Sequence, residues 1–183
     1  TVEKAAEAKV PKFIANVMQP MNAQQGDKLP VSTFTGIENG VFPAGTAAYE
    51  KRCIAVDVPQ WHSENCIQCN QCSMVCPHAS IRPYLLTQEE VAKAPKDFGG
   101  IKALGKGFED FTFKVQVSPY DCTGCGSCAN VCPAKEKALV MEPVETQLPQ
   151  SENWDYALSL DAKVIPTNLY SVKGSQFSKP LLE

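Results

Sequence analysis

Eight of the nine cysteines fall into two runs of the form Cys-x2-Cys-x2-Cys-x3-Cys-Pro. Three thiolates spaced two residues apart can curl round three corners of a [4Fe–4S] cubane, and in two-cluster proteins the fourth cysteine of each run ligates the other cluster. The repeated pattern therefore predicts one-electron redox chemistry at two iron–sulfur clusters. The runs are Cys66, Cys69, Cys72 and Cys76 before Pro77, and Cys122, Cys125, Cys128 and Cys132 before Pro133.

The crossing of the fourth cysteines predicts two mixed ligand sets. Cluster one is expected on Cys66, Cys69, Cys72 and Cys132. Cluster two is expected on Cys122, Cys125, Cys128 and Cys76. Pro77 and Pro133 fix φ and suit a sharp exit from each loop.

The two runs differ between their cysteines, so we expect the two clusters to have different potentials. Gln68 and Asn70 stand in the first run where Gly124 and Gly126 stand in the second. Glycine lets the backbone approach a cluster without a Cβ clash. Backbone N–H groups there can donate to sulfur and tune its potential. The order of the two potentials does not follow from the sequence.

A structural zinc site is the alternative to iron–sulfur ligation. Zinc sites of four cysteines usually combine two Cys-x2-Cys pairs across a longer stretch. Here three cysteines fall within seven residues, the fourth precedes proline, and the whole pattern occurs twice. The spacing therefore favours iron–sulfur clusters over zinc or disulfides.

Five further residues near the runs have both a functional and a plain structural interpretation. Cys53 is interpreted as a buried thiol that acts as a small hydrophobe. His62 and His78 flank the first run, and His78 either hydrogen-bonds near the cluster or lies on the surface. Arg82 and Lys137 follow the runs, where a cation favours a reduced cluster or is simply solvated.

The elements that position the cysteines form an internal repeat, in which Cys66 corresponds to Cys122, 56 positions later. Apolar segments at 54–58 and 111–117 precede the runs, and extended segments at 81–86 and 138–141 follow them. Each copy is predicted to form a strand, a cysteine loop, a short helix and a strand. Residues 87–110 form an insertion whose helix starts at a capping box of Thr87 and Glu90 and ends near Pro95.

The predicted architecture is therefore α+β, a two-[4Fe–4S] ferredoxin-like core with pseudo-twofold repeated halves and extended N- and C-terminal arms. The core is residues 53–145, the arms are 1–52 and 146–183. The first arm is expected to hold helices within 1–18 that end at Pro20, with an apolar face, and then an ordered loop. In the second arm Ser151 is expected to cap a helix, and residues 168–183 to be an arm with aromatic anchors. The helix faces are Phe13, Ile14, Val17 and Met18, then Trp154, Leu158 and Tyr156.

Composition narrows the function further. The chain has 183 residues, 44% of them hydrophobic, and a net charge of −3. Two oxidised clusters with their thiolates bring the charge to roughly −7. Without a basic block, nucleic acid and anionic membranes are poor partners, and no apolar run is long enough to span a bilayer. Cysteines used as thiolates predict a reducing, cytoplasmic compartment. No catalytic residues are expected, because the sequence holds none of the common catalytic motifs.

Sequence well beyond the cysteines resembles the pyruvate:ferredoxin (flavodoxin) oxidoreductase family of anaerobic metabolism. The resembling stretches include GDKLPVS, FPAGTAAYEKR, ENCIQCNQCSMVCPHASIRP, DCTGCGSCANVCPAKEKALVM and SVKGSQFSKPLLE. The resemblance implies an electron-transfer domain with flanking linkers that passes electrons from a thiamine-diphosphate site to external ferredoxin or flavodoxin. It implies that the eight cysteines of the runs are the ligands of the two outer clusters, and that Cys53 is a neutral departure.

In that family, the cysteines of a third cluster and the thiamine-binding domain follow this region. They are not part of this sequence, which starts at Thr1 and resembles a segment of a longer enzyme. The chain is therefore not expected to decarboxylate pyruvate alone. The alternative function is a freestanding two-cluster carrier, or the electron-transfer subunit of another redox complex. Such a carrier has no need of about 90 residues of cysteine-free arms, because di-cluster units are compact.

We expect the chain to be largely unfolded without its clusters, because clusters that fill the core couple ligation to folding. The measurement is far-UV circular dichroism before and after anaerobic removal of iron. A native-like spectrum of the iron-free chain would contradict this prediction.

Overall fold

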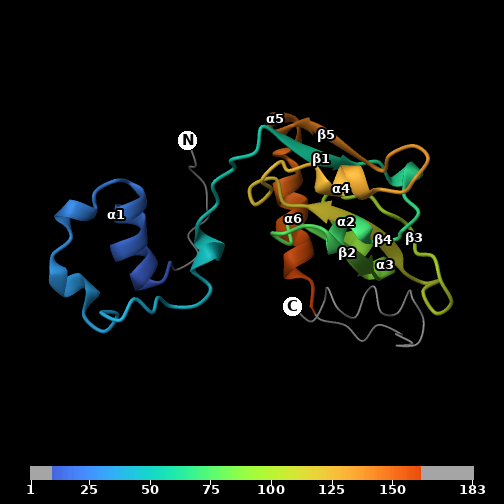
Figure 1. Cartoon of the computed structure of the whole chain (residues 1–183). Helices are drawn as coiled ribbons and strands as arrows, with labels where there is room; N and C mark the ends of the chain where they lie inside the picture. Colours follow the sequence, from blue (N-terminus) through green and yellow to red (C-terminus); the bar gives the residue numbers. More distant parts are fainter. Residues whose placement is uncertain (1–9, 162–183) are drawn as a thin grey trace. The chain divides into compact units, whose positions relative to one another are not determined.

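The computed structural model describes residues 10–161, and the chain divides into two units (Figure 1). The first unit is 1–51 and the second starts at Arg52, one residue before the predicted start of the core. Predictions for 1–9 and for 168–183 lie outside the described residues.

The first unit is a series of short helical turns: η1 (Ile14–Met18), α1 (Gln19–Asn22), η2 (Gly26–Lys28), η3 (Val31–Phe34) and η4 (Thr46–Tyr49). The predicted apolar face is confirmed, since Ile14 and Val17 are buried. The Phe13 and Phe42 rings lie 5.5 Å apart. The prediction that the helix ends at Pro20 is wrong. Helical backbone continues from η1 directly into α1, and Pro20 lies in the first turn of α1.

The second unit contains two small antiparallel sheets, so its class is α+β. β1 (Asp57–Trp61) pairs with β5 (Leu139–Pro143). In the other sheet, β4 (Thr112–Val117) lies between β2 (Ile81–Leu86) and β3 (Ile101–Lys102). The helices are η5 (Ser63–Asn65), α2 (Gln71–Met74), α3 (Gln88–Lys93), α4 (Ser127–Val131), α5 (Val144–Gln147) and α6 (Gln150–Ser159).

Strands pair between the two cysteine copies. β1, before the first run, pairs with β5, which follows the second run. β4, before the second run, pairs with β2, which follows the first. Because the ladder hydrogen bonds of each sheet need a strand from both copies, neither copy can complete a sheet alone.

Three of the four predicted strands lie where the sequence placed them, and the first is displaced. β1 starts at Asp57 instead of residue 54. Ile54 and Val56 are 64% and 80% exposed, so their apolar side chains do not face the core of this chain. The register with β5, in which Asp57 lies opposite Pro143, decides which residues form the strand.

The central strand β4 is buried on both faces. Phe113, Val115 and Val117 contribute to the main apolar cluster together with Cys128 of the second run. The alternating side chains Lys114 and Gln116 are buried as well. The apolar alternation in the sequence predicts that the face with Phe113, Val115 and Val117 is buried. It does not indicate that other segments cover the opposite face, which carries Lys114 and Gln116.

The segment that covers this second face belongs to the predicted C-terminal arm. α6 packs against β4 and runs alongside the sheets in Figure 1, and Gln116 Nε2 donates to the carbonyl of Gln150 at 3.2 Å. The described part of the segment from residue 146 therefore packs on the sheet and does not form an extended arm. The predicted helix is present, and its Trp154 and Ala157 side chains are buried.

Two details of α6 were predicted wrongly. Ser151 does not cap it, because the helix begins at Gln150 after Pro149, without a side-chain cap. Leu158, predicted on the same face as Trp154, is half-exposed whereas Trp154 is buried. The backbone of Pro149 is already helical, and the helix starts two residues earlier than a Ser151 cap would place it.

The insertion also contributes to the core. β3 extends the β2–β4 sheet, and Phe98 packs with Leu86 and Ala157. The capping box is confirmed: Thr87 N–H donates to Glu90 Oε2 at 2.7 Å, and Glu90 N–H donates to Thr87 Oγ1 at 3.3 Å. The helix ends at Lys93, just before Ala94 and Pro95.

No helix among residues 10–161 is both long enough and apolar enough to cross a membrane.

Replacing Thr87 by alanine removes one half of the capping box. We expect T87A to lower the free energy of unfolding by about 1 kcal/mol, measured by urea denaturation of the anaerobically prepared chain. T87S keeps the hydroxyl and is the control, expected near the parent value. Equal losses in both variants would show that the cap hydrogen bond contributes nothing.

Candidate metal centres

Each cysteine run leads into a short helix through a loop with two left-handed residues. In the first run these are Gln68 and Asn70, with φ of 56° and 59°. In the second run they are Gly124 and Gly126, at the corresponding positions, with φ of 71° and 72°. The two loops therefore have the same backbone bends. Glycine adopts them without strain and asparagine tolerates them, whereas glutamine needs other interactions to hold them.

The structure gathers cysteines from both runs around each of two cavities. Cavity one is lined by the first three thiols of the first run and the last thiol of the second: Cys66, Cys69, Cys72 and Cys132. Trp61, Asn70, Val115 and Leu139 contribute to its wall.

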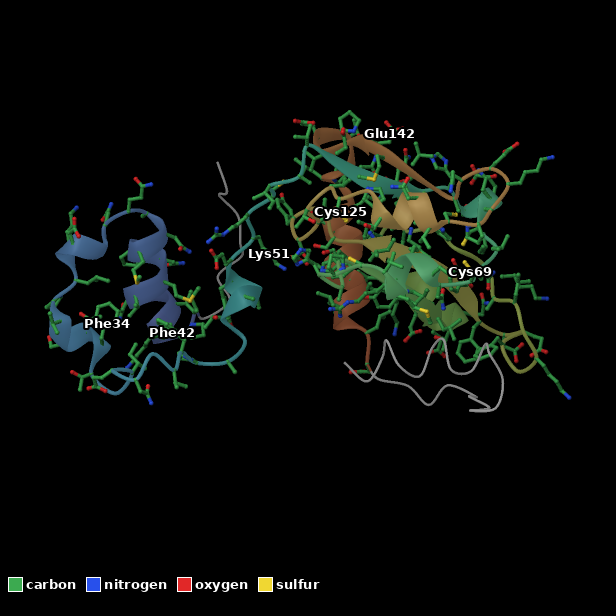
Figure 2. All side chains as sticks on the ribbon, viewed as in Figure 1. Phe34, Phe42, Lys51, Cys69, Cys125 and Glu142 are labelled. Carbon is green, nitrogen blue, oxygen red and sulfur yellow. The ribbon has the colours of Figure 1, made fainter. Side chains whose placement is uncertain are left out.

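Cavity two has the reciprocal composition. Its thiols are Cys122, Cys125, Cys128 and Cys76, joined by Pro59, His78, Val117 and Met141 among others. Figure 2 shows Cys69 and Cys125, one from each run, well apart on the ribbon. The empty volumes, counting space open to solvent, are similar at about 340 Å³ and 380 Å³.

These cavities group the cysteines as the two predicted ligand sets do. The fit to an iron–sulfur cluster rests on this donor chemistry, four thiols around an otherwise mostly apolar space. Among residues 10–161, no three or more His, Cys, Asp or Glu side chains are arranged as a group that could hold a single metal ion. The thiols thus line a space without converging on one point. The ligand assignment itself stays a prediction.

Burial governs the protonation of the inner thiols. It raises the pKa of Cys72 to about 12 and that of Cys128 to about 11, with neighbouring cysteines adding to the shift. Cys125 is exposed, and hydrogen bonding by the Ser127 hydroxyl lowers its pKa. Because metal ligands must be deprotonated, cluster binding at the buried thiols releases protons.

Backbone N–H groups point at sulfur in the second site. Gly124 N–H donates to Cys122 Sγ at 3.4 Å, which confirms the expectation of N–H donors in this loop. Ser80 N–H donates to Cys76 Sγ at 3.3 Å. Such donors stabilise negative charge on the ligand and tune the site.

Gln68 and Gly124 occupy corresponding positions in the two loops but make different contacts. Gln68 Nε2 donates to the carbonyl of Lys102 and its Oε1 accepts from Leu104 N–H, both at 2.8 Å, so this side chain ties the first loop to the insertion. A Cβ on Gly124 would lie 2.9 Å from the Asp57 carbonyl and 3.3 Å from Ala55 Cβ. The second loop therefore packs directly on the first residue of β1 and on Ala55 before it.

The remaining residues of interest have mainly structural contacts. Cys53 lines neither cavity and packs beside Ala55 and Val58, and it is half-buried instead of fully buried as predicted. Its backbone is left-handed, with φ of 50°. His62 Nδ1 lies 3.6 Å from Glu64 Oε1, while the exposed His78 lines cavity two.

The two cations after the runs both have partners. Arg82 lies over the Trp154 ring, 5.3 Å from its centroid. Lys137 Nζ donates to the carbonyls of Asn130 and Cys132, at 3.1 Å and 2.7 Å, and so binds the end of α4. A cation there is favoured by the helix dipole.

Three residues at or next to the first site were not predicted from the sequence to contribute to it. Trp61 and Asn70 line cavity one, and Lys114 lies 5.1 Å from the centroid of the Trp61 ring. Trp61 and Lys114 lie outside the cysteine runs, five residues before Cys66 and eight residues before Cys122. The one available signal was the presence of asparagine where the second copy has glycine.

Two protein families match parts of the chain. Residues 65–136 match a 4Fe-4S dicluster domain. Residues 1–55 match a family described as EKR, a domain of unknown function. The dicluster match identifies the cofactors as two [4Fe–4S] clusters.

Several oxidoreductases are similar to nearly the whole chain. A pyruvate-flavodoxin oxidoreductase of Enterobacter agglomerans is 55% identical over 96% of the chain. A pyruvate:ferredoxin oxidoreductase of Moorella thermoacetica is 56% identical over 94%. A mitochondrial pyruvate dehydrogenase [NADP(+)] of Euglena gracilis is 47% identical over 94%. The chain spans only 15%, 15% and 9% of their respective lengths.

Alanine substitutions at the two glycines of the second loop separate backbone strain from steric overlap. We expect G126A to cost about 1 kcal/mol of stability through its left-handed backbone alone, because its Cβ meets only Asn130 Nδ2, at 3.9 Å. G124A adds the overlap with the Asp57 carbonyl, so its loss should be at least twice as large. The measurements are urea denaturation and iron content, and equal losses would contradict the packing role of Gly124.

Proposed function

We propose that this chain, which corresponds in sequence to one segment of the pyruvate:ferredoxin and pyruvate-flavodoxin oxidoreductases, carries single electrons through two [4Fe–4S] clusters. The observation that supports this most strongly is the sorting of eight cysteines into two cavities, each with four thiols from both runs. The match of residues 65–136 to a dicluster domain supports the same chemistry.

The protein supplies ligands and a shielded environment. In this proposal, Cys66, Cys69, Cys72 and Cys132 hold cluster one, and Cys122, Cys125, Cys128 and Cys76 hold cluster two. When bound, each cluster takes up and releases one electron. Trp61, Val115 and Leu139 limit the access of water to the first site, and Pro59, Val117 and Met141 do so at the second. Lower polarity strengthens every charge interaction at these sites.

The finer fold that we propose is a two-[4Fe–4S] ferredoxin-like core with pseudo-twofold symmetry. The element order supports it: β1, α2 and β2 surround the first run in the order in which β4, α4 and β5 surround the second. The pairing of β1 with β5 and of β2 with β4 supports it too. The exchange of a cysteine between copies then fixes the two halves to each other at two points.

The wider role that we propose is that of a relay inside a larger oxidoreductase. Its electrons would come from a thiamine-diphosphate site and a third cluster in parts of the enzyme outside this chain, and leave to external ferredoxin or flavodoxin. The similarity extends over 94–97% of the chain in the bacterial relatives above and in a relative from Klebsiella pneumoniae. Because this coverage must include most of the residues on both sides of the cysteine runs, it favours an integral segment over a freestanding carrier. A reducing cytoplasmic location suits this role.

The first test is electron paramagnetic resonance of the full chain, purified without oxygen and reduced with dithionite. We expect about two spins per chain, with broadening from two neighbouring paramagnets. Zinc without iron, together with a silent spectrum, would overturn the proposal.

Single ligand substitutions test the crossing of the fourth cysteines. We expect C132S and C69S to leave the same residual signal, that of cluster two, because both remove a ligand of cluster one. C76S and C125S should leave the other signal. C53S is the matched control and should retain both clusters, since Cys53 lines neither cavity. If C132S gives the same spectrum as C125S, each run ligates its own cluster and the proposed ligand sets are wrong.

A further inference from the structure

The Asn70 side chain is an unpartnered amide in the wall of cavity one. Asn70 is 2% exposed, and neither its Oδ1 nor its Nδ2 has a hydrogen-bond partner. A buried amide without a partner is costly, and nearly all such groups in proteins are satisfied. Asn70 also holds a left-handed backbone conformation. No protein group in the described residues satisfies the Asn70 amide, so its burial needs another explanation.

The cavity itself offers the missing partner. Asn70 lines cavity one beside Cys66, Cys69 and Cys72. A cluster and its thiolates are hydrogen-bond acceptors that carry negative charge, and the amide Nδ2 is a donor. The corresponding residue of the second run, Gly126, has no side chain to make such a bond. This potential donor is thus present at one site and missing at the other.

A buried cation lies on the far side of the same cavity wall. Lys114 is 6% exposed, and its Nζ donates to the Phe98 carbonyl and lies 5.1 Å from the Trp61 ring centroid. Trp61 lines cavity one, so one indole separates the ammonium from that site. No carboxylate is paired with Lys114 in the part of the chain that the structure describes.

The charge of Lys114 persists at neutral pH. Burial lowers its pKa to about 8, which still leaves the amine mostly protonated at pH 7. A negative charge nearby favours the protonated form further. Lys114 and Trp61 also line a polar cavity behind β4 with Gln116, Gln147 and Gln150. Asp97 is the one acidic residue in the lining of that cavity.

We propose that the Asn70 amide donates a hydrogen bond to sulfur at the first site. Asn70 and Lys114 together outweigh the backbone N–H donors to Cys122 and Cys76 at the second site and give cluster one the higher reduction potential. Reduction adds negative charge to a cluster, and donors or cations close to it stabilise that charge. Low polarity around both residues keeps their effect from being screened. Under this proposal, which rests on the proposed function, an electron shared between the clusters resides mainly on cluster one.

The test exchanges the two corresponding residues. N70G removes the amide and suits the left-handed backbone. G126N adds an amide to the second loop, where a Cβ meets only an ordinary contact and asparagine tolerates the conformation. The readout is a redox titration of the full chain followed by electron paramagnetic resonance, with iron content measured in parallel.

We expect N70G to shift the higher midpoint potential in the negative direction and leave the lower one unchanged. We expect G126N to shift the lower midpoint in the positive direction. The proposal is overturned if N70G loads both clusters and neither midpoint moves, or if both variants act on the same transition. Should N70G fail to load iron, G126N decides alone: an upward shift of the lower midpoint supports the role of the amide, and no shift refutes it.

The contribution of Lys114 is tested separately with K114M, which keeps a long side chain and removes the charge. We expect it to lower the midpoint of cluster one, the transition that N70G affects. K106M is the matched control, because Lys106 is exposed in the insertion, and should move neither midpoint. Equal shifts of both midpoints in K114M would show a general charge effect and overturn the role of Lys114. Failure of the proposed function would give a different result from failure of this proposal, because the unsubstituted chain would then show no iron–sulfur signal.

Discussion

The position of the fourth cysteine in each run constrains the whole second unit. Cys132 lies at cavity one and Cys76 at cavity two, so each site needs both copies of the repeat. Strand pairing follows the same rule, since both sheets join a strand from each copy. A site and a sheet that each require both halves make the unit cooperative. Neither half has a core, a complete sheet or a complete set of thiols by itself.

The apolar core is built around the thiols. Cys128 is one of its buried members, and Cys66, Cys72 and Cys76 pack against it. A domain of this size buries a limited share of its surface, and here much of the centre is reserved for two clusters. The segments outside the repeat compensate for this. α6 covers β4, and the insertion adds β3 and Phe98, so that apolar contacts surround a centre occupied by sulfur.

The two sites have the same backbone and different surroundings. Both loops bend through left-handed residues at corresponding positions. In the second loop glycines allow close packing on the first residue of β1 and on Ala55 before it. In the first, Gln68 bonds to the insertion and Asn70 faces the cavity. A duplicated unit with identical clusters thus gains two distinct environments, which an electron relay requires if its electrons are to favour one direction.

The sequence by itself determined the cofactor chemistry, the four-and-four division of the cysteines and most of the strands. These features depend on local spacing: cysteine intervals, alternation in β4 and the Thr87–Glu90 capping box are readable along the chain. The tertiary structure decided the rest, because the register between strands far apart in sequence has no local signal. It displaced β1 to Asp57, placed α6 on β4, and brought Trp61 and Asn70 to cavity one, with Lys114 next to the Trp61 ring. These neighbours come from separate strands and loops, so spacing along the chain does not encode their proximity.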